Sequence, residues 1–215
     1  MEKLVRLSFD EGQIEGNLVI PKGAAGIVLF AHGSGSSRHS PRNRYVAGVL
    51  QKAGLATLLI DLLTPEEEEI DVRTARLRFD IGLLATRLVV ATDWLAKDAA
   101  TRALNIGYFG ASTGAAAALV AAAERPAVIG AVVSRGGRPD LAAAALSRVR
   151  APTLLIVGGE DGPVIGMNQF ALDRLPGEKE LVIVPGATHL FEEPGALEEV
   201  ARLAEGWFSR HLAGK

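Results

Sequence analysis

The sequence predicts an α/β protein in which helices cover both faces of a mostly parallel sheet. Short, continuously apolar runs such as 26–31 (GIVLFA) and 153–157 (TLLIV) are typical of strands that are buried on both faces. These runs alternate with helix-like segments, and two alternating runs at 3–9 and 13–20 precede them as a hairpin with a turn at 10–12. Alternation of this kind predicts a three-layer α/β/α sandwich.

The elements expected after the hairpin extend to the end of the chain. Gly54 is a helix-ending signal, and Asp80 can cap the start of a long amphipathic helix. In order, we expect strand 26–31, helix 42–53, strand 55–60, a solvated loop at Glu66–Glu69, helix 80–97, a strand from Leu104 that runs into a helix after Gly114, strand 128–133, helix 140–147, strand 153–157, helix 164–175, strand 180–184 and helix 195–212.

Length and composition set the class of protein. The 215 residues suffice for one domain, 1–215, with 48% hydrophobic and 22% charged residues. A net charge of −2 gives no reason to expect binding to nucleic acid or to a membrane. The absence of Cys excludes disulfides and thiolate chemistry, and we expect neither a cofactor nor a metal. The first residues lack the apolar core of a signal peptide, which predicts a cytoplasmic protein.

The stretch Gly110-Ala-Ser-Thr-Gly114 carries the strongest functional signal. It joins a β-forming run to an Ala-rich helical run, and G-x-S-x-G between a strand and a helix is the pattern of a nucleophile elbow. The two glycines leave room for a sharp turn that presents the Ser112 hydroxyl at the end of the strand. We therefore expect Ser112 to be a nucleophile.

A serine nucleophile needs a base and an acid that orients it. Asp161 and His189 follow Ser112 in the order associated with this elbow, each after a predicted strand. His32 fits better as a loop-stabilising residue, His39 could line a pocket mouth, and His211 is expected in solvent. For the acid, the alternatives to Asp161 are its neighbour Glu160, then Asp140 and Asp61, which also suit roles in caps or turns.

Two backbone amides would complete the site as an oxyanion hole. One belongs to Thr113, the residue after the nucleophile, and the other to Ser34 in the small loop after 26–31. That loop, His32-Gly-Ser-Gly35, matches neither a P-loop ending in Gly-Lys-Ser/Thr nor a dinucleotide fingerprint.

The segments FAHGSGSS, GYFGASTG, LLIVGGEDGPV and PGATHLF together resemble the α/β-hydrolase superfamily, in particular the small serine hydrolases related to dienelactone hydrolase. This resemblance covers nearly the whole chain. It implies an eight-stranded sheet with an antiparallel second strand, Ser112, Asp161 and His189 as a catalytic triad, and Ser34 and Thr113 as oxyanion amides. Dienelactone hydrolases proper use Cys as nucleophile, so Ser112 favours ordinary carboxylic esters.

The predicted activity is that of a carboxylesterase-type serine hydrolase. The short segment 125–140 leaves no room for a large lid domain, which favours small or short-acyl esters as substrates. The alternatives are a thioesterase, peptidase or acyltransferase with the same triad, or a binding module without catalysis. A homodimer stays open, as does the role of five arginines, which either form a basic rim for a carboxylate-bearing substrate or balance surface charge: Arg73, Arg76, Arg78, Arg135 and Arg138.

Overall fold

The computed structural model describes residues 1–10 and 12–213, so the expected turn at 10–12 includes one residue, Glu11, that lies outside the described part. Eight strands form one sheet in the order β1-β2-β4-β3-β5-β6-β7-β8. They are β1 (Glu2–Phe9), β2 (Gly12–Val19), β3 (Gly26–Ala31), β4 (Ala56–Ile60), β5 (Asn105–Ala111), β6 (Ile129–Arg135), β7 (Thr153–Gly158) and β8 (Lys179–Val184).

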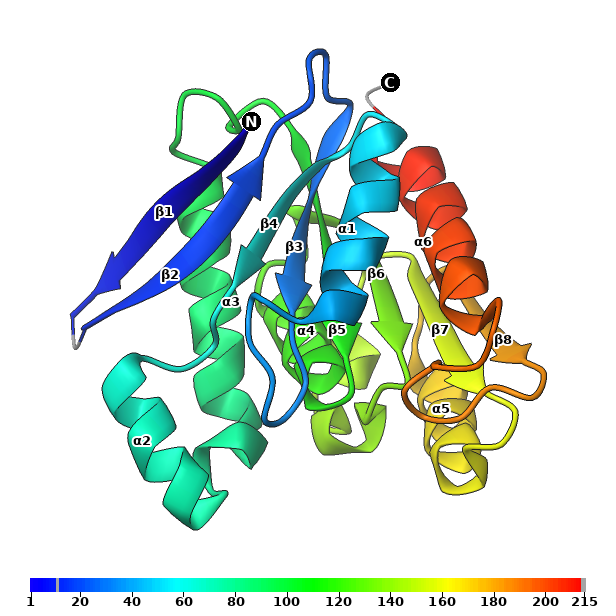
Figure 1. The fold of residues 1–215 in the computed structure, drawn as a ribbon. Coiled ribbons are helices and arrows are strands. Elements are labelled where there is room, and N and C mark those ends of the chain that lie inside the picture. Colours follow the sequence, from blue (N-terminus) through cyan, green and yellow to red (C-terminus); the bar gives the residue numbers. More distant parts are fainter. Residues whose placement is uncertain (11, 214–215) are drawn as a thin grey trace.

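The second strand is antiparallel, as the resemblance implied. Strand β2 pairs antiparallel with both β1 and β4, whereas β4, β3, β5, β6, β7 and β8 pair parallel with one another. The carboxyl ends of six strands therefore lie along one edge, which is the lower edge of the sheet in Figure 1. Ligands of open α/β sheets bind at that edge.

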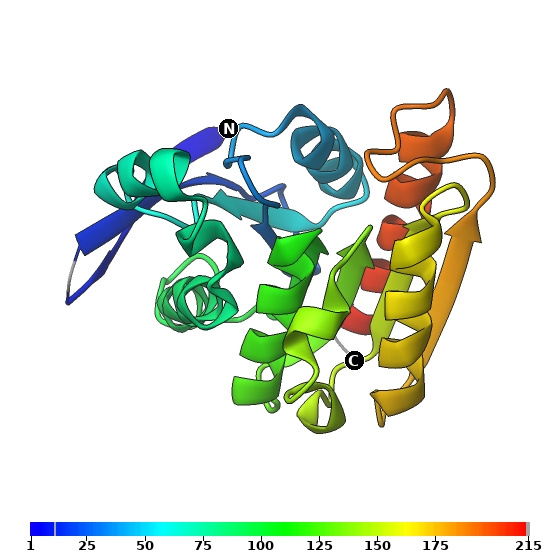
Figure 2. The ribbon, with the colours of Figure 1, turned by 90° about the horizontal axis from the view of Figure 1, so that it is seen from below.

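Helices cover the sheet on both faces (Figure 2). Helices α1 and α6 pack on one face, and α3, α4 and α5 on the other, while α2 lies beside the carboxyl edge (Figures 1 and 2). The helices are α1 (Pro41–Lys52), α2 (Pro65–Thr74), α3 (Ile81–Leu95), α4 (Thr113–Glu124), α5 (Gly162–Arg174) and α6 (Ala196–Leu212). The chain thus has the expected three layers.

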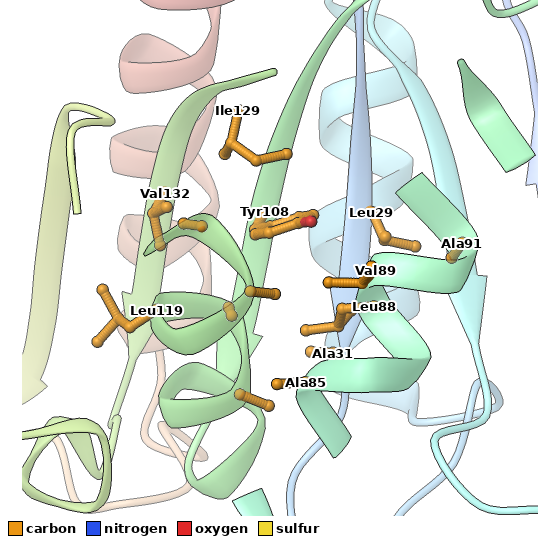
Figure 3. Close-up of a cluster of buried hydrophobic side chains, with 14 of the residues drawn as sticks. Leu29, Ala31, Ala85, Leu88, Val89, Ala91, Tyr108, Leu119, Ile129 and Val132 are labelled. Carbon is orange, nitrogen blue, oxygen red and sulfur yellow. The ribbon is translucent and has the colours of Figure 1, made fainter. Parts of the chain in front are cut away.

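The core under α3 and α4 explains why the middle strands read as unbroken apolar runs. All six residues of β3 are buried, because helices cover both of its faces. Leu29, Leu88 and Tyr108 meet between the sheet and these helices (Figure 3). The Tyr108 hydroxyl is 2.5 Å from Thr92 Oγ1, so the buried phenol retains a hydrogen bond.

The prediction of a solvated loop at Glu66–Glu69 is wrong, because this acidic segment belongs to helix α2. Thr64 caps the helix and Glu67 returns the bond to the Thr64 N–H, forming a capping box, with Pro65 at the first helical position. Farther along the helix, Asp71 is buried and binds Arg78.

Two smaller expectations also differ. The short helix expected at 140–147 is two 3₁₀ turns, Pro139–Ala142 and Leu146–Arg148. Strand β6 continues to Arg135, so Ser134, expected in the loop after the strand, is a fully buried strand residue.

Candidate active site

Ser112 occupies a strained turn between β5 and α4. Its φ of 52° and ψ of −120° lie outside the regions that residues with a side chain ordinarily adopt. The Ser112 N–H donates to the carbonyl of Arg135 at 3.2 Å, and the Ser112 carbonyl accepts from the Arg138 N–H at 3.1 Å. The chain around β6 therefore holds the turn from both sides.

The two glycines of G-x-S-x-G are required by close backbone contacts. A Cβ on Gly110 would lie 2.4 Å from the Cα of Ala115, and a Cβ on Gly114 would lie 2.4 Å from the carbonyl oxygens of Ala31 and His32. Any side chain at either position would push α4 away from β5 or from the end of β3. The elbow thus depends on these two contacts as well as on the conformation of Ser112.

Asp161 and His189 form a direct pair. Asp161 follows β7, His189 follows β8, and His189 Nδ1 lies 2.6 Å from Asp161 Oδ2. The loops meet because Gly158 has no side chain: a Cβ there would be 2.3 Å from the carbonyl of Ala187. A carboxylate on Nδ1 fixes the imidazole so that Nε2 is free to accept a proton.

Ser112 and His189 line one cavity of about 170 Å³ at the carboxyl edge. The His189 ring lies over Gly136, where an added Cβ would be 3.4 Å from the ring carbon Cε1. Among the described residues, the two side chains do not hydrogen bond directly to each other. Such bonds commonly tighten only when substrate is bound.

The two residues whose amides are expected in an oxyanion hole, Ser34 and Thr113, lie side by side. The loop after β3 packs on the elbow, since a Cβ on Gly33 would be 3.1 Å from Ser112 Cβ. Ser34 Oγ is 3.0 Å from Thr113 Oγ1. Within the described residues, neither the Ser34 N–H nor the Thr113 N–H has a hydrogen-bond partner, and Thr113 is the first residue of α4. Free amides at a helix N-terminus favour negative charge.

The other three histidines have different surroundings. His32 is buried, its Nδ1 donates to the Gly33 carbonyl at 2.9 Å, and its Nε2 accepts from the Leu62 N–H at 3.1 Å, which confirms its structural role. Burial lowers the pKa of His32 and keeps it neutral. His39 is exposed and lines a separate cavity. His211, expected in solvent, is instead largely covered, with its ring 4.7 Å from that of Trp207.

The alternative acids are paired with arginines or exposed. Both carboxylate oxygens of Asp140 accept from Arg138, at 2.9 and 2.7 Å, and Asp61 pairs with Arg38. Glu160 is exposed. Of the acids weighed from the sequence, Asp161 is the one that contacts His189.

The five arginines singled out from the sequence separate into two kinds. Arg73 and Arg76 are exposed on or after α2, Arg78 pairs with Asp71, and Arg138 pairs with Asp140. Arg135 differs, because it is buried and lines the cavity with Ser112 and His189. Arg42 of α1 lines the same cavity, and sequence reasoning missed it because no local signal sets it apart.

The described part of the chain contains no group of three or more His, Asp or Glu side chains arranged to hold a metal ion. None of the helices in that part has the length and apolar character needed to cross a membrane.

The strand order, the elbow and the loops at the carboxyl edge define an α/β-hydrolase fold. The profile of the Dienelactone hydrolase family matches residues 14–212, so the chain belongs to that family. A dienelactone hydrolase from Anabaena variabilis is 70% identical, and the match covers 99% of this chain and 98% of the other, with a TM-score of 0.97.

More distant solved structures share the fold. Est1E from Butyrivibrio proteoclasticus is 16% identical with a TM-score of 0.82, over 97% of this chain and 98% of its own. Carboxyl esterase 2 from Tuber melanosporum is 16% identical with a TM-score of 0.76, over 99% of this chain and 87% of its own. These two structures show that the fold is shared, whereas it is the match to the Dienelactone hydrolase family that places the chain in a family of hydrolases.

A Mycobacterium tuberculosis protein provisionally named phosphoribosyl transferase is 62% identical over 201 residues. The match covers 94% of this chain and 44% of that protein. The chain therefore spans less than half the length of this curated relative.

Proposed function

We propose that this protein hydrolyses small carboxylic esters through an acyl-enzyme on Ser112. One observation carries the proposal: a strained serine at a helix N-terminus shares a cavity with a histidine that is already paired to a carboxylate. Nucleophile, base and orienting acid are the three parts that serine acyl transfer requires.

In the proposed reaction, Ser112 Oγ attacks the ester carbonyl carbon while His189 Nε2 takes the hydroxyl proton. The carbonyl oxygen becomes an oxyanion, which accepts hydrogen bonds from the Ser34 and Thr113 amides. His189 returns the proton to the departing alcohol as the C–O bond breaks, leaving Ser112 acylated. Water then attacks the acyl-enzyme with His189 as base and releases the acid. Asp161 stabilises the charged imidazole in both halves.

Small substrates suit the dimensions of the site. The cavity of about 170 Å³ holds only a few heavy atoms beyond the reacting ester. Between β6 and β7 the chain makes two 3₁₀ turns rather than a cap domain. We therefore propose short acyl groups, and expect kcat/KM to fall as the acyl chain of a p-nitrophenyl ester grows.

The test compares Ser112→Ala with Ser147→Ala, an exposed serine in the second 3₁₀ turn. Ser112→Ala should lower turnover of p-nitrophenyl acetate by about 10⁴-fold or more while the circular dichroism spectrum stays native. Ser147→Ala should keep wild-type turnover. Retained turnover in folded Ser112→Ala protein would refute the acyl-enzyme.

Other acceptors or bonds would use the same residues. A panel of matched ester, thioester and amide substrates, with and without an added alcohol acceptor, separates an esterase from a thioesterase, peptidase or acyltransferase. Binding of a small ester without turnover would favour a binding module.

We propose that the transferase name of the mycobacterial relative does not extend to this chain. The match covers 44% of that relative, and the hydrolase family profile accounts for 14–212 here. Release of pyrophosphate from phosphoribosyl pyrophosphate by this chain would contradict this.

A further inference from the structure

One short segment after β6 contacts both the candidate nucleophile and the candidate base. This support loop consists of residues 136–138. The Arg138 N–H donates to the Ser112 carbonyl at 3.1 Å. At the other end of the loop, Gly136 has a φ of 51° and lies against His189, where an added Cβ would be 3.2 Å from the His189 carbonyl oxygen. A displacement of the support loop would therefore disturb the nucleophile and the base together.

The support loop is fixed by the elements around it. The Gly136 N–H donates to the carbonyl of Ile156 on β7 at 2.8 Å. Gly137 packs closely on β6, because a Cβ there would collide with Ser134 Oγ. The Gly137 carbonyl accepts a hydrogen bond from Asn168 Nδ2 at 3.0 Å. Of these contacts, the bond from Asn168 is the one that a side chain donates.

Asn168 belongs to α5, the helix that begins next to the candidate acid. Asp161 is the residue that flanks the N-terminus of α5, and its carbonyl accepts the first hydrogen bonds of the helix at 3.0 and 3.1 Å. Asn168 therefore links the helix that starts after Asp161 to the support loop. A single side chain thus joins the segments that carry or contact all three residues of the proposed triad.

Burial alone does not account for an amide at position 168. Asn168 is fully buried, and its Nδ2 donates to the Gly137 carbonyl and to the Val164 carbonyl, the latter at 2.8 Å. Its Oδ1 is enclosed and has no hydrogen-bond partner within the described part of the chain. An enclosed oxygen without a partner is unfavourable, and an apolar side chain of similar volume would avoid that cost. The amide is therefore explained by what its Nδ2 group holds.

We propose that Asn168 is a positioning residue for the proposed ester hydrolysis. Its bond to the Gly137 carbonyl holds the support loop, and with it the separation and orientation of Ser112 and His189. Proton transfer between these two residues depends on their geometry, and a misplacement of about 1 Å lowers a rate by about 10²-fold. Asn168 does not line the cavity of the site, so its effect should fall on kcat rather than on KM. This inference rests on the proposed function and adds a residue to it.

The kinetic test compares Asn168→Leu with Thr153→Val in the hydrolysis of p-nitrophenyl acetate, at a temperature where circular dichroism shows each variant to be folded. Thr153, at the amino end of β7, is buried and donates to the Ala151 carbonyl at 2.9 Å, so Thr153→Val also removes a buried hydrogen bond, but at the opposite edge of the sheet. Asn168→Leu should lower kcat by about 10- to 100-fold with little change in KM, and Thr153→Val should keep both. A wild-type kcat in folded Asn168→Leu would overturn the proposal, whether or not KM rises.

A spectroscopic test does not depend on turnover. The Cε1 proton of His189 lies next to Gly136, so its NMR resonance reports the position of the support loop. This resonance is assigned by its loss in His189→Gln. It should shift in Asn168→Leu and stay in place in Thr153→Val.

The two tests separate the positioning role from the proposed function. A shift in Asn168→Leu, in a protein that hydrolyses no ester, would leave the positioning role standing and refute the proposed function. Ester hydrolysis with the same kcat and the same resonance in Asn168→Leu and wild type would refute the positioning role alone. A lower kcat with an unmoved resonance would assign the effect to the Ser112 side of the support loop. If leucine prevents folding, Asn168→Ala removes the same donor and allows the same comparisons.

Discussion

The two halves of the carboxyl edge treat charge in opposite ways. On the side of β2 and β4, Arg38 donates to Asp61, Glu15 and Asn17, so its guanidinium is fully engaged. On the side of β5 and β6, Arg135 is more deeply buried and has no such partners in the described residues. The strained backbone of Ser112 lies on this second side as well. The unpaired charge of Arg135 and the strained backbone of Ser112 thus lie where we propose catalysis, whereas the paired charge of Arg38 has a structural role.

A second structural ion pair, between Asp71 and Arg78, lies at the end of α2. Asp71 is 1% exposed and accepts hydrogen bonds from the Leu77 and Arg78 N–H groups and from Arg78 Nε at 2.6 Å. These bonds fold the chain after α2 back toward α3. Arg78 also lines a small space beside Ser34 and Thr113, so this ion pair lies next to the loop of the proposed oxyanion hole.

The largest effect is expected from Asp161. Asp161→Asn should lower kcat/KM for a short ester by about 10³- to 10⁴-fold, because the amide can donate a hydrogen bond to Nδ1 and stabilise the wrong tautomer of His189. Glu160→Gln and Asp140→Asn are matched controls, one adjacent and one paired elsewhere, and both should keep activity within a few-fold. Steady-state kinetics at pH 8 measures kcat/KM for each variant. A decrease in Asp140→Asn as large as that in Asp161→Asn would contradict the assignment of Asp161 as the acid of the triad.

The next largest effect is expected on stability, from the buried ion pair between Asp71 and Arg78. Asp71→Ala should lower the free energy of unfolding by about 2–4 kcal/mol, since three backbone and side-chain donors lose their acceptor. Glu66→Ala, an exposed acid on the same helix, should change it by less than about 0.5 kcal/mol. Urea unfolding measures both. Equal effects in the two variants would show that Asp71 contributes no more than a surface acid.

The two buried arginines should respond with opposite signs. Arg135→Met should raise the free energy of unfolding by about 1–2 kcal/mol in the absence of ligand, because an unpaired charge is replaced by an apolar side chain. Arg38→Met should lower it by a similar amount, since Asp61 and Glu15 lose their partner. Destabilisation of both proteins would contradict the contrast between the two halves.

The smallest effect concerns His32. Burial lowers the pKa of His32 in the folded protein. Below about pH 6.5 the unfolded chain therefore binds a proton that the folded protein does not, and the free energy of unfolding decreases as the pH is lowered. Between pH 7 and 6 this amounts to under about 1 kcal/mol. His32→Gln should flatten this dependence, and the exposed His39→Gln should keep it. Parallel profiles for wild type and His32→Gln would exclude His32 as its source.

The elbow and the sheet could be predicted because their signals are local. Gly110 and Gly114 are dictated by contacts within the strand–turn–helix unit and with β3, and the apolar strands reflect burial on both faces. Helix α2 was missed even though Thr64 and Glu67 have capping-box spacing, because consecutive glutamates oppose a helix. Its tertiary contacts, such as Glu67 with Arg87 at 2.6 Å, offset that repulsion.

The sequence could not show which arginines form ion pairs and which line the cavity. Arg135 and Arg138 are three residues apart, and only the fold shows that one meets Asp140 while the other faces the cavity. Arg42 joins Arg135 from a helix more than 90 positions earlier in the chain. Pairing of charges is set by tertiary contacts, which leave no local pattern.

The most direct test of the proposed chemistry is covalent labelling of Ser112. The protein is treated with a small fluorophosphonate, digested, and the adduct is located by mass spectrometry. We predict one adduct on Ser112, absent from Ser112→Ala and much slower to form in Asp161→Asn. An unlabelled Ser112 in folded protein, or equal labelling of another serine in Ser112→Ala, would contradict the account.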